Sequence, residues 1–173
     1  MGITAKTGDG GYTDLLDGKR LRKDHPVIEC LGTLDELNAF LGDAKTTLAP
    51  DAAAIITGIQ KDLFSIMGIL AGAPVPAGGM NEARLDSLIA ELEASLPPFT
   101  SFAVPGANPA SAKLHIARAV CRRAERRLIA LNGEAVSAEQ TGSAKQSEAV
   151  TPYINRLSDL LFLLAQKQIA ESK

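Results

Sequence analysis

The sequence predicts an all-α protein, a five-helix bundle that follows a long glycine-rich N-terminal loop. Five segments carry apolar residues at the three- and four-residue spacing of amphipathic helices, and no segment has a persuasive strand pattern. Aromatic residues make up only 4% of the 173 residues and tryptophan is absent, so Leu, Ile, Val and Ala must build the core. This length suits one domain, and we expect a single domain over residues 1–173.

Residues 1–24 lack helical periodicity and hold several glycines among Lys, Asp and Thr residues, which predicts a long loop. Its centre, 7–13, reads Thr-Gly-Asp-Gly-Gly-Tyr-Thr, and glycines let backbone N–H groups approach an anion closely. Basic residues flank it, although the pattern is not that of a Walker loop. The segment is therefore either a phosphate-binding loop or a solvated arm.

The first helix is expected from Asp24, its N-cap, to about Leu48, with Pro26 in its first turn. The second is expected from Pro50 until Gly72 ends it. Apolar residues recur at helical spacing in both segments: Val27, Leu31, Leu34, Leu41, Ile55, Ile59, Leu63 and Leu70.

Two prolines and two glycines make residues 73–80 a connection. The third helix is expected at 81–96, capped by its first residue, an asparagine, and stopped by two prolines. The fourth is expected at 109–131, with Asn132-Gly133 as its C-terminal stop.

Residues 134–148 are polar and rich in Ser, Ala and Gln, which indicates a connector or a partly helical segment. Thr151-Pro152 then opens the last helix. Its packing positions are Ile154, Leu157, Leu161 and Leu164.

The fourth helix concentrates five arginines in ten residues, 118–127, and such a density usually serves to neutralise a polyanion. At helical spacing one strip of charged residues borders an apolar strip, so it lies at the rim of the core. The charged strip consists of Arg118, Arg122, Glu125 and Arg126. Guanidinium groups beside an apolar wall suit a phosphate chain, and a solvated basic face is the alternative.

Polar residues also interrupt the apolar stripes of the first and last helices. Asp35 lies at a stripe edge, where a carboxylate is costly unless an opposite charge or a metal meets it, and Arg118 is a candidate partner. The alternative is an exposed carboxylate. Asn155 offers a donor and an acceptor to a ligand, whereas Arg156 and Asp159 are explained as a pair three residues apart.

Other side chains that often carry chemistry are expected to be structural. Cys30 and Cys121 stand far apart on apolar faces and are interpreted as small buried hydrophobes. His25 and His115 are lone histidines without a catalytic assignment. Phe102, in an irregular segment, is either a plug for the core end or a wall of a ligand pocket.

The formal net charge of −2 argues against a general nucleic-acid binder. The N-terminus has no apolar run of signal-peptide length, and the longest apolar stretches, 63–72 and 160–165, are shorter than a membrane span. We therefore expect a cytoplasmic protein without a nucleic-acid or membrane partner.

Five motifs occur in one order along the chain. They are Thr7-Gly8-Asp9-x-Gly11-x-Thr13, the run Gly32-Thr33-Leu34-Asp35-Glu36-Leu37-Asn38, Ser101-Phe102 with Pro105-Gly106, the arginine helix, and the run from Tyr153 to Phe162. Together they closely resemble the PduO-type ATP:cob(I)alamin adenosyltransferases over nearly the whole chain. The resemblance implies a homotrimer that binds ATP and a corrinoid between subunits, transfers the 5'-deoxyadenosyl group of ATP to the cobalt of cob(I)alamin, and releases triphosphate.

The resemblance also implies residue roles, with residues 1–24 as the nucleotide-binding loop and 25–173 as the bundle. Asp35 would pair with Arg118 across the subunit boundary, and Phe102 would press on the lower face of the corrin, so these three form the catalytic set. The nucleotide contacts would be Thr4, Lys6, Thr7, Gly8, Asp9, Gly11, Thr13, Lys23, Arg122, Glu125 and Asn155.

Cob(I)alamin is itself a strong nucleophile, so the expected work of the protein is positioning and charge stabilisation, with Mg²⁺ helping at the triphosphate. No residue is assigned to the metal. A cobalamin reductase or an adenosylcobalamin-dependent enzyme is a possible partner. The chain departs from the family pattern at Ala5, Val27, Leu31 and Gln166. A non-catalytic carrier of corrinoid or nucleotide, or a nucleic-acid or partner-binding bundle, are the alternatives.

Overall fold

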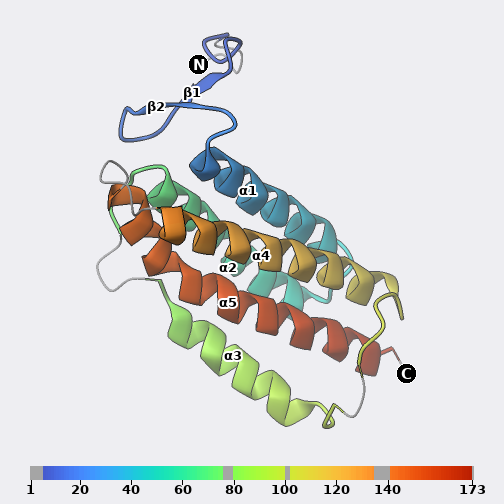
Figure 1. Ribbon diagram of the computed structural model, residues 1–173. Coiled ribbons are helices and arrows are strands. Elements are labelled where there is room, and N and C mark those ends of the chain that lie inside the picture. The colour runs from blue at the N-terminus through green and yellow to red at the C-terminus, as the bar shows by residue number, and fades with distance from the viewer. Residues whose placement is uncertain (1–5, 76–79, 100–101, 135–140, 173) are drawn as a thin grey trace.

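The computed structural model describes residues 6–75, 80–99, 102–134 and 141–172. Within these ranges the fold is a bundle of five helices preceded by a small β-hairpin (Figure 1), so the all-α prediction is confirmed. The elements are β1 (Tyr12–Asp14), β2 (Arg20–Arg22), α1 (Pro26–Lys45), α2 (Pro50–Leu70), α3 (Glu82–Ser95), α4 (Pro109–Glu134) and α5 (Thr141–Ala170). Helix α4 packs against α1 and α5, and α3 lies along the outer side of α5.

The start of α1 differs from the prediction in its capping residue. His25, not Asp24, is the N-cap, because its Nδ1 accepts a hydrogen bond from the backbone N–H of Val27 at 3.2 Å. Asp24 is instead held by Arg22 in an ion pair of 2.6 Å. Pro26 occupies the first turn as expected, and His25 has the structural role that the sequence predicted.

The predicted positions of α2 and α3 are confirmed to within a few residues. Asn81 caps α3 by accepting from the backbone N–H of Arg84 at 3.2 Å. Helix α2 ends at Leu70, and Gly72 follows with a φ of +104°, a backbone conformation that glycine adopts without steric cost.

Two predicted boundaries are wrong. Helix α4 continues through Asn132-Gly133 to Glu134, and α5 begins at Thr141, so Pro152 lies inside a helix rather than at its start. Of the two alternatives for residues 134–148, the partly helical one is confirmed, because 141–148 belong to α5. The residues just before Pro152 pack into the bundle, since Ser147 and Val150 are fully buried and the hydroxyl of Ser147 donates to the side chain of Asn132. Such tertiary packing can override a local helix signal.

The glycine-rich segment is not the plain loop that the sequence predicted. Strands β1 and β2 pair antiparallel, with Thr13 opposite Leu21. Arg20 holds the hairpin to the preceding turn, because it forms an ion pair with Asp14 at 2.9 Å and donates to the backbone carbonyl of Thr7 at 2.7 Å. The hairpin lies beyond the start of α1 (Figure 1).

The core is aliphatic, as the composition predicted. Cys30 and Cys121 are fully buried free thiols, which confirms their interpretation as small hydrophobes. By length and composition α2 could cross a membrane, contrary to the sequence expectation, and it is the one described helix that meets this criterion. Its apolar stripe nevertheless packs into the bundle, through Ile56, Ile59, Leu63, Ile66, Ile69 and Leu70.

Candidate functional site

The basic face of α4 is divided into two sets of cations. One set is committed to α1, where Arg123 pairs with Glu36 and Arg127 pairs with Glu29 at 3.1 Å. Lys113 completes this row by pairing with Asp43 of α1 at 2.7 Å. These cations therefore hold two helices of the bundle together.

The other set has no such partner. Among the described residues, Arg118, Arg122 and Arg126 form no ion pair. The Nε of Arg118 is buried and also lacks a hydrogen-bond partner, which is costly for a guanidinium group. Arg122 and Arg126 are exposed. This second set is the one available to an anion or to another protein chain.

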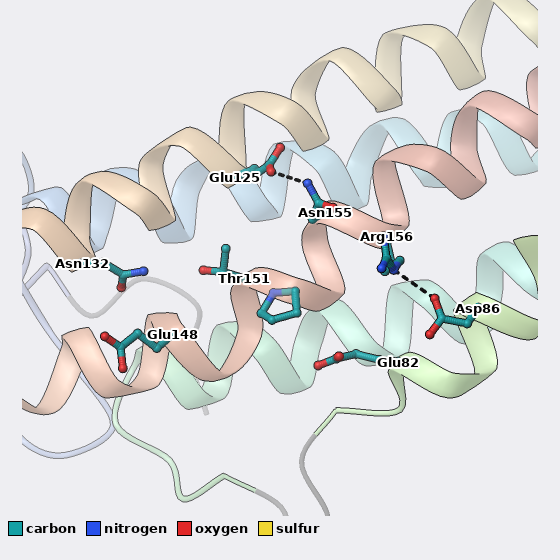
Figure 2. Close-up of a pocket in the computed structure, with 9 residues that line it drawn as sticks. Glu82, Asp86, Glu125, Asn132, Glu148, Thr151, Asn155 and Arg156 are labelled. Carbon is teal, nitrogen blue, oxygen red and sulfur yellow. Dashed lines mark hydrogen bonds and ion pairs between the residues drawn. The ribbon is translucent and has the colours of Figure 1, made fainter.

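Asn155 and Glu125 lie beside this unpaired set. The Nδ2 of Asn155 on α5 donates to the Oε1 of Glu125 on α4 at 2.6 Å. Figure 2 shows the pair at the edge of a cavity of about 480 Å³ between α3, α4 and α5. The cavity is lined by Glu82, Asp86, Glu125, Asn132, Glu148, Thr151, Pro152, Asn155 and Arg156.

The sequence did not predict that α3 contributes Glu82 and Asp86 to the lining of this cavity. Arg156 of α5 pairs with Asp86 of α3 at 3.0 Å, more closely than with Asp159 at 4.0 Å, the pair that its spacing predicted. Periodicity assigns an acidic face to α3 but not the helix that it packs against. No local signal could have found this contact.

The glycine-rich turn and Lys23 lie together. A Cβ placed on Gly8 would lie 3.2 Å from the Nζ of Lys23, and the backbone N–H of Lys23 donates to the carbonyl of Gly11 at 2.9 Å. The backbone N–H of Asp9 donates to the carbonyl of Lys6 at 3.3 Å and closes the turn. The structure thus gathers most of the predicted N-terminal nucleotide contacts on one edge of the hairpin, with Thr7 held by Arg20 and Thr13 in β1.

Thr4 lies outside the described residues. Within the described part of the chain, no hydrogen bond or ion pair joins residues 6–23 to Arg122, Glu125 or Asn155. In Figure 1 the hairpin lies beyond the start of α1, whereas α3 lies along α5. The residues that line the cavity come from α3, α4 and α5. The described part of a single chain therefore does not bring together the two groups of residues expected to bind nucleotide.

Asp35 is also without a partner in the protomer. It is exposed, and it forms no ion pair with Arg118 or any other described residue. It lies at a second cavity of about 390 Å³ between the hairpin, α1 and α2, lined mostly by apolar side chains. Leu31, one of the family departures, lines the same cavity, and Val27 is buried in the core beside it.

Phe102 is fully exposed, at 101% of its reference surface, so the interpretation as a plug for the core end is wrong. The ring before it in the segment, Phe99, packs edge-on against Phe162 at 5.3 Å between centroids. His115 is buried beside Phe162, and neither of its ring nitrogens has a hydrogen-bond partner among the described residues. Phe102 is thus presented to whatever lies outside the protomer.

The titratable side chains of the core are not activated as nucleophiles. Burial raises the pKa of the Cys30 thiol to about 12, and burial with the neighbouring Glu125 raises the pKa of the Cys121 thiol further. Burial and the adjacent Arg118 lower the pKa of His115. The raised pKa values leave both thiols in the neutral form, which is a poor nucleophile, whereas the lowered pKa only keeps His115 uncharged.

A family model described as cobalamin adenosyltransferase matches residues 3–168. The chain belongs to the cobalamin adenosyltransferase family. A cobalamin adenosyltransferase of Cupriavidus metallidurans is 40% identical over 171 residues, which cover 95% of this chain and 86% of that protein. The corrinoid adenosyltransferase MMAB of Bos taurus is 36% identical over 177 residues, 95% of this chain and 70% of the relative.

Solved structures give the same assignment. A phenylalanine-to-alanine variant of a PduO-type ATP:corrinoid adenosyltransferase from Lactobacillus reuteri, complexed with cobalamin and ATP, has a TM-score of 0.85 to this chain. The two are 26% identical, and the match covers 99% of this chain and 95% of that one. The resemblance seen in the sequence motifs is confirmed at the level of family and fold.

Proposed function

We propose that this corrinoid adenosyltransferase transfers the 5'-deoxyadenosyl group of ATP to the cobalt of cob(I)alamin at a site formed by two neighbouring subunits. The observation that carries the proposal is the division of the α4 cations. Arg123 and Arg127 are bound to α1, whereas Arg118, Arg122 and Arg126 are left for a ligand or a second chain next to the Asn155–Glu125 pair.

In this proposal Arg122 and Asn155 contact ATP from one subunit, and Glu125 holds the amide of Asn155 in place. The hairpin edge with Lys6, the glycine turn and Lys23 wraps the nucleotide from the adjacent subunit. The separation of these two groups within one protomer supports an assembly in which they face each other. The family resemblance points to a homotrimer as that assembly.

Asp35 and Arg118 support the same arrangement. Each is a charged group at the protomer surface or rim without an ion-pair partner in the described chain, and one is the complement of the other. We propose that they pair across the subunit boundary, where the second subunit would satisfy the buried Nε of Arg118. A buried guanidinium N–H without an acceptor would otherwise cost stability.

The transfer makes a bond from cobalt to C5' of ATP and breaks the bond from C5' to the triphosphate oxygen, which leaves with the electron pair. Cob(I)alamin is the nucleophile, so the protein supplies alignment of the three atoms and positive charge for the leaving group. Arg122, the backbone N–H groups of the glycine turn and Lys23 are suited to that second task. The raised pKa values of both thiols are consistent with a protein that provides no nucleophile of its own.

Among the described residues, no group of three His, Cys, Asp or Glu side chains could hold a metal ion. The residues therefore do not fit a resident metal centre, and Mg²⁺ would arrive with the phosphates of ATP. Phe102 is proposed to cover the lower face of the corrin, where it excludes an axial ligand and so favours reduction of cobalt. We further propose a cytoplasmic location and a reductase that supplies Co(I).

Anaerobic absorption spectroscopy tests the function. Cob(I)alamin mixed with ATP and the protein should lose the Co(I) spectrum and gain that of an alkylcobalamin, with one triphosphate released per turnover. Omission of ATP or of protein should leave the Co(I) spectrum unchanged. Binding of both ligands without this conversion would instead support a non-catalytic carrier.

A further inference from the structure

Residues 153–156 make up one turn of α5, and each of the four contacts another helix. The four pairs are Tyr153 with Asp62 of α2, Ile154 with Cys121 of α4, Asn155 with Glu125 of α4, and Arg156 with Asp86 of α3. Figure 2 shows the last two pairs, one reaching from α5 to α4 and the other from α5 to α3. The turn that carries the proposed nucleotide contact is therefore fixed from three directions.

Of the three contacts made by side chains of this turn, that of Tyr153 starts from a fully buried side chain. Its side chain has no exposed surface, and its hydroxyl donates to the Oδ2 of Asp62 at 2.6 Å. Burial and the Asp62 carboxylate raise the pKa of Tyr153, so the phenol keeps its proton and remains a donor at physiological pH. The Arg156–Asp86 pair is half-exposed and is therefore a weaker constraint.

Arg84 of α3 extends this contact to a third helix. Its Nη1 lies 3.7 Å from the same Oδ2 of Asp62 that accepts from Tyr153. The guanidinium reaches that position across Gly58, where an added Cβ would lie 2.7 Å from Nη1. Glycine at position 58 thus leaves the space in which Arg84 joins α3 to Asp62.

The backbone of α5 is weak just before this turn. Pro152 has no N–H, so the helix lacks the hydrogen bond to the carbonyl of Glu148, and the ring crowds that carbonyl. The hydroxyl of Thr151 donates to the carbonyl of Ser147 at 2.6 Å, a bond that tends to bend a helix. The orientation of residues 153–156 therefore depends more on their side-chain contacts than it would in an uninterrupted helix.

Tyr153 and Asn155 lie roughly 200° apart around the helix axis, so an inward anchor at the first sets the outward direction of the second. We infer that Tyr153, Asp62 and Arg84 form a positioning relay, made possible by Gly58, that aims the amide of Asn155 at the nucleotide. This inference rests on the proposed function of Asn155. None of the relay residues is proposed to touch either substrate.

Initial rates of the wild-type enzyme and three variants test the relay, each measured against ATP and against cob(I)alamin in turn. Tyr153→Phe removes the hydroxyl and keeps the ring. Gly58→Ala displaces the flexible end of Arg84 without changing Asp62 or Tyr153. Gly68→Ala is the matched control on the same helix, because its Cβ would make an ordinary contact of 3.8 Å.

We expect the KM for ATP to rise about tenfold in Tyr153→Phe and about threefold in Gly58→Ala. These changes correspond to full or partial loss of the proposed hydrogen bond between Asn155 and the nucleotide. The KM for cob(I)alamin should stay within about twofold in both. Gly68→Ala should match the wild type. A merely structural role would lower the amount of active enzyme, and thus the apparent kcat, while both KM values stayed unchanged.

That last pattern, or an unchanged KM for ATP in Tyr153→Phe, would overturn the relay while leaving the proposed function intact. Absence of ATP-dependent transfer in the wild type would instead contradict the proposed function itself. Thermal unfolding of each variant shows whether the folded fraction accounts for any loss of rate.

Discussion

The side-chain amide of Asn155 on α5 donates to the carboxylate of Glu125 on α4 across 2.6 Å. This bond uses one of the two N–H donors of the Asn155 amide, while the amide oxygen of Asn155 accepts no hydrogen bond from a described residue. The pair sits next to arginines that the bundle does not use. A ligand that carries both phosphates and a polar base could therefore bind where α4 and α5 meet. The arginines would contact its phosphates, and the oriented amide of Asn155 would form a hydrogen bond to it.

Replacement of Phe102 by alanine should separate the two stages of the reaction. The side chain is fully exposed in the protomer, so the free energy of unfolding should change by less than about 0.5 kcal/mol. Turnover should fall much more when Co(II) and a reductant are supplied than when Co(I) is preformed, because the variant no longer excludes the lower axial ligand. Val104→Ala, an exposed neighbour, is the control. Equal losses in both assays would refute the axial role.

Asp35→Asn should weaken the assembly. The variant removes the charge proposed to pair with Arg118 of the adjacent subunit. Loss of one member of a desolvated ion pair should raise the dissociation constant of the oligomer about tenfold or more. Sedimentation velocity over a dilution series measures this. Glu36→Gln is the matched control, since the neighbouring carboxylate pairs with Arg123 inside the protomer. An unaltered oligomer with full activity would show that Asp35 has no role at the boundary.

Gly72→Ala should displace the β1–β2 hairpin, which is proposed to bind nucleotide. Position 72 has a φ of +104°, and an added Cβ would lie 2.6 Å from the Cβ of Asp17 in the loop between β1 and β2. The strain should lower the free energy of unfolding by about 1–3 kcal/mol in urea titrations, and the KM for ATP should rise. Gly68→Ala should stabilise by up to about 1 kcal/mol. Equal stabilities of the two variants would contradict this account of the docking.

The cysteines should be unreactive in the folded protein. With the pKa of Cys30 at about 12, roughly one thiol in 10⁴ is ionised at pH 8, and Cys121 is still less ionised. An aromatic disulfide reagent should label neither until urea unfolds the chain, after which both should react. Rapid labelling of the native protein would contradict the burial of these thiols.

The raised pKa of Cys30 makes the stability of the folded protein depend on pH. The pKa of Cys30 in the folded protein lies above the value of 9.0 for an exposed thiol, so the neutral thiol is the form that the fold favours. Its contribution is complete below pH 9 and is lost as the pH rises toward 12, because only the unfolded chain then ionises freely. The free energy of unfolding should therefore decrease over that interval.

Much of the fold could be predicted because helical periodicity is a local property. The apolar stripes identified all five helices, and Asn81 and Pro26 were correctly placed at helix starts. The hairpin was missed because strands of three residues are too short to show alternation, and because Arg20 closes it through contacts distant in sequence. The start of α5 was missed because the burial of Ser147 and Val150 before Pro152 depends on other helices and is not visible in the local sequence.

The site was predicted only in part, because contacts between helices are not visible in the local sequence. Helical spacing located the arginine strip and its apolar border, but all five arginines look alike in sequence. Which of them are free depends on the register of α1, whose Glu29 and Glu36 take Arg127 and Arg123. The role of Tyr153 was likewise hidden, since its partner Asp62 lies on another helix.

The adjacent residues Arg122 and Arg123 offer the most direct test of the central claim. Isothermal titration of ATP into each alanine variant compares a cation that the bundle leaves unpaired with one that it binds to Glu36. The account predicts that Arg122→Ala weakens ATP binding about 10- to 100-fold, as expected for a charge-assisted contact, while Arg123→Ala changes it less than about threefold. Wild-type affinity in Arg122→Ala, or an equal loss in both variants, would contradict it.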